Sequence, residues 1–107
     1  MRAMGRLEAM QKFIELQPND PFPRYGVAME LKNLGRLDEA EAAFAELERR
    51  FPDYVPQYLM RFNVLAALGR KDDARQLAGR GLETIRRAGN GHAEGELAQA
   101  LAALDEE

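Results

Sequence analysis

The chain has 107 residues, no cysteine and a formal net charge of -3. A chain of this length can bury the core of one small domain, and without cysteine it cannot form disulfides or thiolate zinc sites. The small net charge gives no overall field that favours nucleic acid, and no apolar stretch approaches the roughly 18 residues of a membrane span, so we expect a soluble cytoplasmic protein with no membrane partner.

Two helices are predicted in the first third of the chain. Apolar residues recur every three to four positions over residues 3–17, and Pro18 ends this helix. Asp20 is suited to cap the next helix, with Pro21 at its first position. That helix ends at Gly35, because glycine tolerates the left-handed conformation of a helix C-terminus.

The middle of the chain predicts two more helices. One opens with Asp38 and Glu39, whose charges suit the positive end of a helix, and runs to about Arg50 before Pro52 breaks it. The next covers residues 55–69 and carries a single charge. A helix with so few charges is expected to be covered on nearly every side.

The last two predicted helices cover residues 71–88 and 91–105. Residues 89–91 form the strongest break in the chain, because two glycines flank an asparagine. No segment alternates with period two, so the sequence predicts six antiparallel helices and no strand. The final helix is amphipathic, with an apolar stripe that includes Leu97, Leu101 and Leu104.

A repeat links the middle helices. The segment 31–40 recurs as 65–74, an offset of 34 residues, and Pro18 and Pro52 are separated by the same 34. A period of about 34 residues is known for a helical repeat. The chain is therefore predicted to be a short helical array.

The pattern resembles the tetratricopeptide repeat (TPR) family, whose unit is a helix–turn–helix hairpin with small and aromatic residues at set positions. Counting from Pro21, the sequence matches with Val27, Ala28, Leu31, Gly35, Ala40, Phe44 and Pro52. It departs with Arg24 and Leu47. Counting from Val55, it matches with Tyr58, Leu65, Gly69, Ala74 and Gly81 and departs with Arg61, Phe62, Ala78 and Arg86.

The resemblance implies an all-α fold, a right-handed α-solenoid fragment, with one TPR domain over residues 1–107. Its parts would be an N-terminal half repeat at 3–18, two repeats at 21–54 and 55–88, and a capping helix at 91–105. The layout is similar to that of small stand-alone bacterial TPR proteins.

Small residues mark the expected helix contacts. Ala40 and Ala74 lie where the two helices of a hairpin would approach closely, and a larger side chain there would force the helices apart. Gly81 would allow the same approach in the last pair. Gly79 indicates either local tolerance of a weak helix or a flat contact surface.

The resemblance also implies that a partner binds in a concave groove formed by the first helix of each repeat. The residues expected to line it are Phe22, Tyr25, Met29, Lys32, Asn33, Leu59, Met60, Asn63 and Ala67. This mainly apolar set suits an extended peptide or an amphipathic helix. It matches the carboxylate clamp of related domains only with Asn63, so no clamp is expected.

Two alternatives bear on the groove. A terminal helix would fill it, in which case these residues are simply core. Arg24 and Arg61 are expected near the same face, where they would either pair with carboxylates of a partner or extend to solvent.

Catalysis is not predicted. The chain has no serine or cysteine and a single threonine, Thr84, so the usual nucleophiles are almost absent. His92 is the only histidine, and its place at a helix start favours a capping or exposed role. We expect no enzyme activity, no metal and no cofactor.

Nucleic-acid binding is the less favoured function. Arg75 and Arg86 lie on one face of the predicted helix 71–88, where they would touch phosphates. The acidic net charge opposes this, and pairing with Glu94 and Glu96 is the favoured role.

The favoured function is a protein–protein interaction module, an adaptor or assembly factor. The alternative is a homodimer formed through the groove or through the stripe of Leu97, Leu101 and Leu104.

Overall fold

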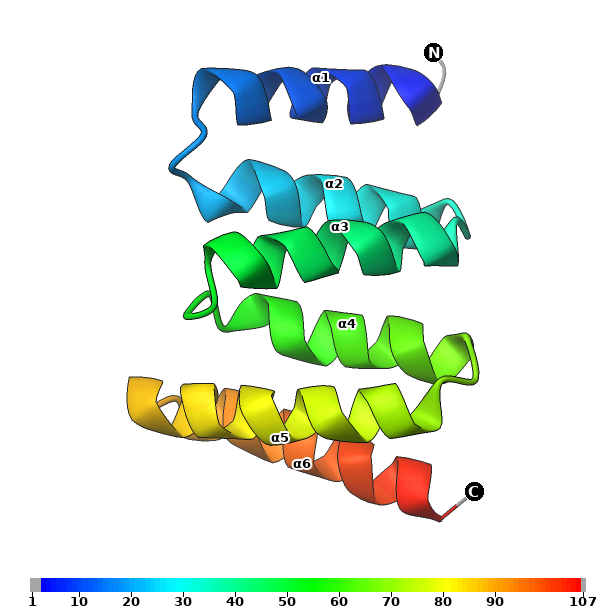
Figure 1. Cartoon of the computed structure of the whole chain (residues 1–107), viewed down its shortest axis with the longest axis vertical. Coiled ribbons are helices and arrows are strands. Elements are labelled where there is room, and N and C mark those ends of the chain that lie inside the picture. The colour runs from blue at the N-terminus through cyan, green and yellow to red at the C-terminus, as the bar shows by residue number, and fades with distance from the viewer. Residues whose placement is uncertain (1–2, 107) are drawn as a thin grey trace. The chain divides into compact units, whose positions relative to one another are not determined.

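The computed structural model describes the backbone of residues 3–106 and the side chains of residues 5–106. Six α-helices and no strand occupy this part of the chain, so the predicted all-α fold is confirmed (Figure 1). The helices are α1 (Ala3–Leu16), α2 (Pro21–Asn33), α3 (Leu37–Arg50), α4 (Pro56–Ala67), α5 (Lys71–Ala88) and α6 (Gly91–Asp105).

The predicted N-cap of α2 is confirmed. The amide of Phe22 donates to Asp20 Oδ1 at 3.0 Å, and Pro21 occupies the first helical position. Proline needs no hydrogen-bond acceptor there, and the aspartate satisfies one of the free amides of the first turn. The start of α2 is therefore fixed by residues that the sequence identifies.

The two turns within the repeated segment have the same geometry. Gly35 and Gly69 have φ values of 76° and 77°. In each turn the amide after the glycine donates to the carbonyl five residues back, at 2.9 Å. This left-handed conformation is strained for other residues, which explains why glycine recurs at this position. It also ends α4 at Ala67, two residues before the predicted boundary of residue 69.

The helices form two compact units, unit 1 (Met1–Phe51) with α1 to α3 and unit 2 (Pro52–Glu107) with α4 to α6. The organisation as one TPR domain with repeats at 21–54 and 55–88 remains a prediction. None of the helices in the described part of the chain is both long and apolar enough to cross a membrane.

In unit 1, α2 packs against both α1 and α3. Ala40 is fully buried where α3 faces α2, as the sequence predicts for a close helix contact. Gly26 brings α2 close to α1, since a Cβ built on it would lie 3.2 Å from Met10 Sδ. The buried apolar residues of this unit are Leu7, Val27, Ala28, Leu31, Ala40, Phe44 and Leu47.

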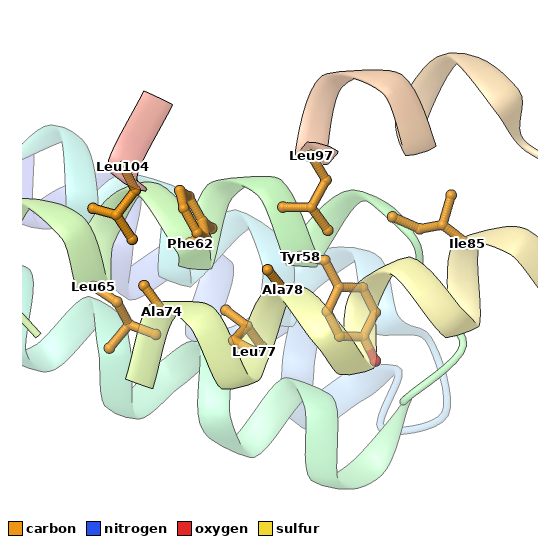
Figure 2. Close-up of a cluster of buried hydrophobic side chains, with 9 residues drawn as sticks. All are labelled: Tyr58, Phe62, Leu65, Ala74, Leu77, Ala78, Ile85, Leu97 and Leu104. Carbon is orange, nitrogen blue, oxygen red and sulfur yellow. The ribbon is translucent and has the colours of Figure 1, made fainter. Parts of the chain in front are cut away.

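In unit 2, α6 packs against both α4 and α5 and completes the core. The buried cluster shown in Figure 2 comprises Tyr58, Phe62, Leu65, Ala74, Leu77, Ala78, Ile85, Leu97 and Leu104. Leu97 and Leu104 point from α6 into this cluster and are 0% and 3% exposed. Leu101 packs against its edge.

The core of unit 2 corrects one expectation about the stripe on α6. The sequence gives Leu97, Leu101 and Leu104 as a candidate surface for a second copy. An amphipathic helix buries its apolar face, and α6 buries this face in the core of its own unit. Leu97 and Leu104 are therefore core and are not available for dimerisation, whereas Leu101 is half-buried.

Gly81 marks a close helix contact in unit 2. A Cβ on Gly81 would lie 2.9 Å from Leu97 Cδ2 and 3.0 Å from Tyr58 Cβ, whereas Gly79 has nothing within 4 Å of the same position. The expected close approach at Gly81 is thus present. Gly79 is exposed and marks no contact within the described residues.

These two glycines make a matched pair for a stability test. We expect Gly79→Ala to raise the free energy of unfolding by about 1 kcal/mol, because alanine is the better helix former and meets no neighbour. The same gain applies to Gly81→Ala, but overpacking against Tyr58 costs about 1–3 kcal/mol, so the net effect is destabilising by about 1 kcal/mol. Urea unfolding followed by circular dichroism measures both, and equal effects of the two variants would contradict the packing at Gly81.

Candidate interaction surfaces

Five of the predicted binding residues share one side of α2. Their spacing of three or four residues places them opposite the buried Val27 and Leu31. Two members of the set, Phe22 and Asn33, are exposed, and the other three are half-buried. The five, which we call the α2 face, are Phe22, Tyr25, Met29, Lys32 and Asn33.

Tyr25 anchors the α2 face to the core of unit 1. Its ring packs edge-on against Phe44, with ring centroids 6.3 Å apart and an interplanar angle of 65°. Burial raises the pKa of Tyr25, so its hydroxyl is uncharged at neutral pH. An edge-to-face aromatic pair contributes about 0.5–1.5 kcal/mol beyond the area that it buries. Tyr25 therefore presents a fixed aromatic surface.

Phe22 is the most exposed apolar residue of the α2 face, at 65%. It lies in the first turn of α2, where the Asp20 cap and Pro21 hold the backbone. Because this backbone is fixed, little conformational entropy of the main chain is lost when a partner covers Phe22.

The remaining predicted residues lie on α4 in unit 2. Asn63 and Ala67 are exposed, and Leu59 and Met60 are half-buried. Leu59 also packs against the buried cluster of unit 2, so it serves the core as well as the surface. We call these four residues the α4 face. The α2 and α4 faces belong to different units, and their union in one groove remains a prediction.

Neighbouring helices leave part of each face uncovered. α1 packs against α2, yet Phe22 and Asn33 remain exposed. α6 packs against α4, yet Asn63 and Ala67 remain exposed.

Arg24 differs from the expectation, since it lies beside α3 residues. It is half-buried, and its Nε is buried with no hydrogen-bond partner among the described residues. Burial and, after it, repulsion by Arg50 lower the pKa of Arg24 below its usual range. Residue 24 is the fourth of the predicted repeat, where the family has a large residue, and this is why the guanidinium enters a packed region.

Glu46, the carboxylate that acts on Arg24, is already engaged. Glu46 accepts hydrogen bonds from Arg49 Nε and Nη2 at 2.9 and 2.6 Å and from Arg50 Nε at 2.5 Å. These bonds, first those from Arg49 and then those from Arg50, lower the pKa of Glu46 to about 2. The cluster thus holds three arginines and one glutamate. The sequence signal that could have located it is the arginine at the fourth repeat position together with the basic end of α3.

The arginines of α5 pair with acidic residues of α6. Arg86 Nε lies 2.6 Å from Glu94 Oε2, as expected from the sequence. Arg75 lies 2.9 Å from Asp105 and 3.0 Å from Asp72 in place of the expected Glu96. Because both arginines already have carboxylate partners, the face is a weak candidate for phosphate binding.

His92 is exposed and lies 3.5 Å from Glu96. The described residues contain no cluster of three or more histidines and acids that could hold a metal ion.

A scan against protein-family models finds no match for this chain, and a search of the curated proteins finds none. Solved structures do match. The crystal structure of a tetratricopeptide repeat domain protein from Salinibacter ruber is 34% identical over 80% of this chain and 97% of that chain, with a TM-score of 0.76. A solution NMR structure of the same Salinibacter ruber target is 34% identical over 83% of this chain and 90% of that chain, with a TM-score of 0.77.

A third match shows the fold alone. It is the TPR2B domain of yeast Sti1 in a complex with pHsp70, which is 19% identical over 94% of this chain and 80% of that chain, with a TM-score of 0.86.

Removal of the charge at Arg24 should stabilise unit 1. We expect Arg24→Met to raise the free energy of unfolding by about 1 kcal/mol, because methionine keeps the aliphatic packing and leaves no buried donor without a partner. Arg49→Met is the control, and it should give no gain because Arg49 already binds Glu46. Urea unfolding measures both, and a loss of stability in Arg24→Met would contradict this view of the cluster.

The Glu46 cluster predicts a pH dependence. The pKa of Glu46 is lower in the folded chain, about 2, than its usual 4.5. Its contribution to stability is therefore fully present above about pH 4.5 and is lost as the pH falls towards about 2. Thermal unfolding of the wild type and of Glu46→Gln from pH 7 to pH 3 should show melting temperatures that converge in acid. A constant difference across this range would contradict the prediction.

Proposed function

The chain belongs to the tetratricopeptide repeat family, and on this basis we propose that it is a protein–protein interaction module, an adaptor or assembly factor. The observation that carries the proposal is the α2 face, where an exposed Phe22 lies beside a Tyr25 fixed against Phe44. Rigid aromatic side chains bury a large area at a small entropic cost, as binding sites require.

The chemistry of the two faces favours a peptide or an amphipathic helix as the ligand. Tyr25 and Met29 offer apolar contact, and methionine adapts to ligands of different shape. Asn33 and Asn63 are exposed amides that can both donate to and accept from a peptide backbone. The proposed partner therefore combines apolar anchors with free main-chain hydrogen-bonding groups.

One comparison supports a protein partner, because the yeast Sti1 domain was solved in a complex with pHsp70. The Salinibacter ruber protein is described only as a tetratricopeptide repeat domain protein. The surface residues of the present chain are not those of these proteins, so their partners do not identify the partner of this chain. We also propose that the protein acts in the cytoplasm and has no catalytic activity.

The proposal can be tested with peptides. We expect peptides selected from a displayed library against the purified chain to shift the amide resonances of α2 and α4. Phe22→Ala combined with Asn63→Ala should weaken their binding at least about tenfold, because a loss of 1.4 kcal/mol suffices for that change.

The control is Gln76→Ala, an exposed residue of α5 outside both faces. Circular dichroism of all variants establishes that they are folded. If the selected peptides bind the Phe22/Asn63 double variant as tightly as they bind the wild type, the two faces are not the binding site.

A further inference from the structure

Helix α1 has two apolar faces, of which one is covered. Leu7 is 3% exposed, and Met10 approaches Gly26 of α2. On another side of the helix Phe13 is 53% exposed and Leu16 is 72% exposed. Two large apolar side chains three residues apart form an unpartnered surface of a kind that marks interaction sites.

The 34-residue period shows which kind of element covers this side of a helix. The residue 34 positions after Phe13 is Leu47, which is 0% exposed, and the next equivalent is Gly81. Gly81 of α5 is in close contact with Leu97 of α6 and with Tyr58 of α4, both on helices that pack against α5. Among the described residues of unit 1, α1 packs against α2 alone. By this equivalence, the position of Phe13 is one that an antiparallel helix covers.

The residues on this side of α1 are ordered by size. Gly5 and Ala9 are small and come first, and Phe13 and Leu16 are large and follow. Their spacing of four, four and three residues keeps them on one stripe, which we call the α1 stripe. The small half has a shallow hollow beside it, lined by Gly5, Glu8, Ala9, Gln11, Lys12 and Glu15.

We propose that the α1 stripe binds the α1 stripe of a second copy of this chain, with the two helices antiparallel. In this arrangement Phe13 lies against Ala9 of the partner, and Leu16 lies against Gly5. The midpoint of the first pair is residue 11 and that of the second lies between residues 10 and 11, so one twofold axis near this point serves both pairs. The contact is isologous, and large side chains fill the space that small ones leave.

The charges beside the α1 stripe fit the same register. Glu8 and Lys12 are both exposed and lie on one flank of the stripe. In an antiparallel pair, Glu8 of one copy comes within one helical turn of Lys12 of the other, and symmetry repeats this pair. In a parallel pair related by a twofold axis, these flanks would lie on opposite sides of the interface, and Glu8 would not meet Lys12 of the other copy. The flank therefore favours the antiparallel orientation.

The proposed dimer is small. A single pair of 14-residue helices buries less than the ~1,600 Å² of a standard interface. The dimer should therefore dissociate on dilution. It involves no residue of the α2 face, so it is separate from the proposed partner binding.

Sedimentation equilibrium over a range of concentrations tests the dimer. The wild type should show a monomer–dimer equilibrium, and Phe13→Glu should raise its dissociation constant at least about tenfold, because the charge would be buried against Ala9. Gln76→Glu adds the same charge on exposed α5 and should leave the equilibrium unchanged. A wild type that is monomeric at every concentration, or a dimer that persists in Phe13→Glu, would overturn the proposal.

Charge reversal tests the register with substitutions at exposed positions, which the fold tolerates. Glu8→Lys and Lys12→Glu should each weaken the dimer, and the double variant Glu8→Lys/Lys12→Glu should restore it, because the pair is rebuilt with its signs exchanged. Failure of the double variant to recover wild-type dimerisation would overturn the antiparallel register. Circular dichroism of each variant establishes that a loss of dimer is not a loss of fold.

Discussion

Close packing between helices at residues with little or no side chain is the constraint on which both units depend. Ala40 and Ala74 are fully buried, and Gly81 has no room for even one further methyl group. Interiors packed at this density cannot absorb added volume without moving a helix. The large core residues, such as Phe44 and Tyr58, can be buried because these small residues let the backbones approach. The sequence repeat thus preserves a distance between helices.

This constraint explains which parts of the fold could be predicted. The turn glycines, the Asp20 cap and the prolines act through the local backbone, so their effect can be inferred from a few neighbouring residues. The bounds of α5 and α6 are those predicted from such signals. Tertiary contacts, in contrast, cannot be inferred from neighbouring residues. The apolar stripe of α6 predicts that one face of the helix is covered but does not predict what covers it. In the structure, α4 and α5 of the same unit cover this face.

The sequence predicts which residues share a side of α2 but not how far each side chain is buried. Helical spacing alone places Phe22, Tyr25 and Met29 on one side of α2. How far each is buried depends on α3, whose Phe44 meets the Tyr25 ring. Arg24 shows the same limit, because the residues around it in the sequence do not indicate that α3 brings Arg50 and Glu46 next to it. The α2 and α4 faces also differ at equivalent positions, since Met29 corresponds to Asn63, so the repeat gives the scaffold and not the binding chemistry.

The attachment of α6 has a consequence for local opening of the chain. α6 contacts two helices, and ion pairs hold it near both ends, Arg86 with Glu94 and Arg75 with Asp105. Its separation from α5 would expose Leu97 and leave a void above Gly81. α1, in contrast, contacts one helix within its unit. Amide hydrogens of α6 should therefore exchange with solvent only when all of unit 2 unfolds, whereas those of α1 exchange through local fraying that leaves α2 and α3 in place.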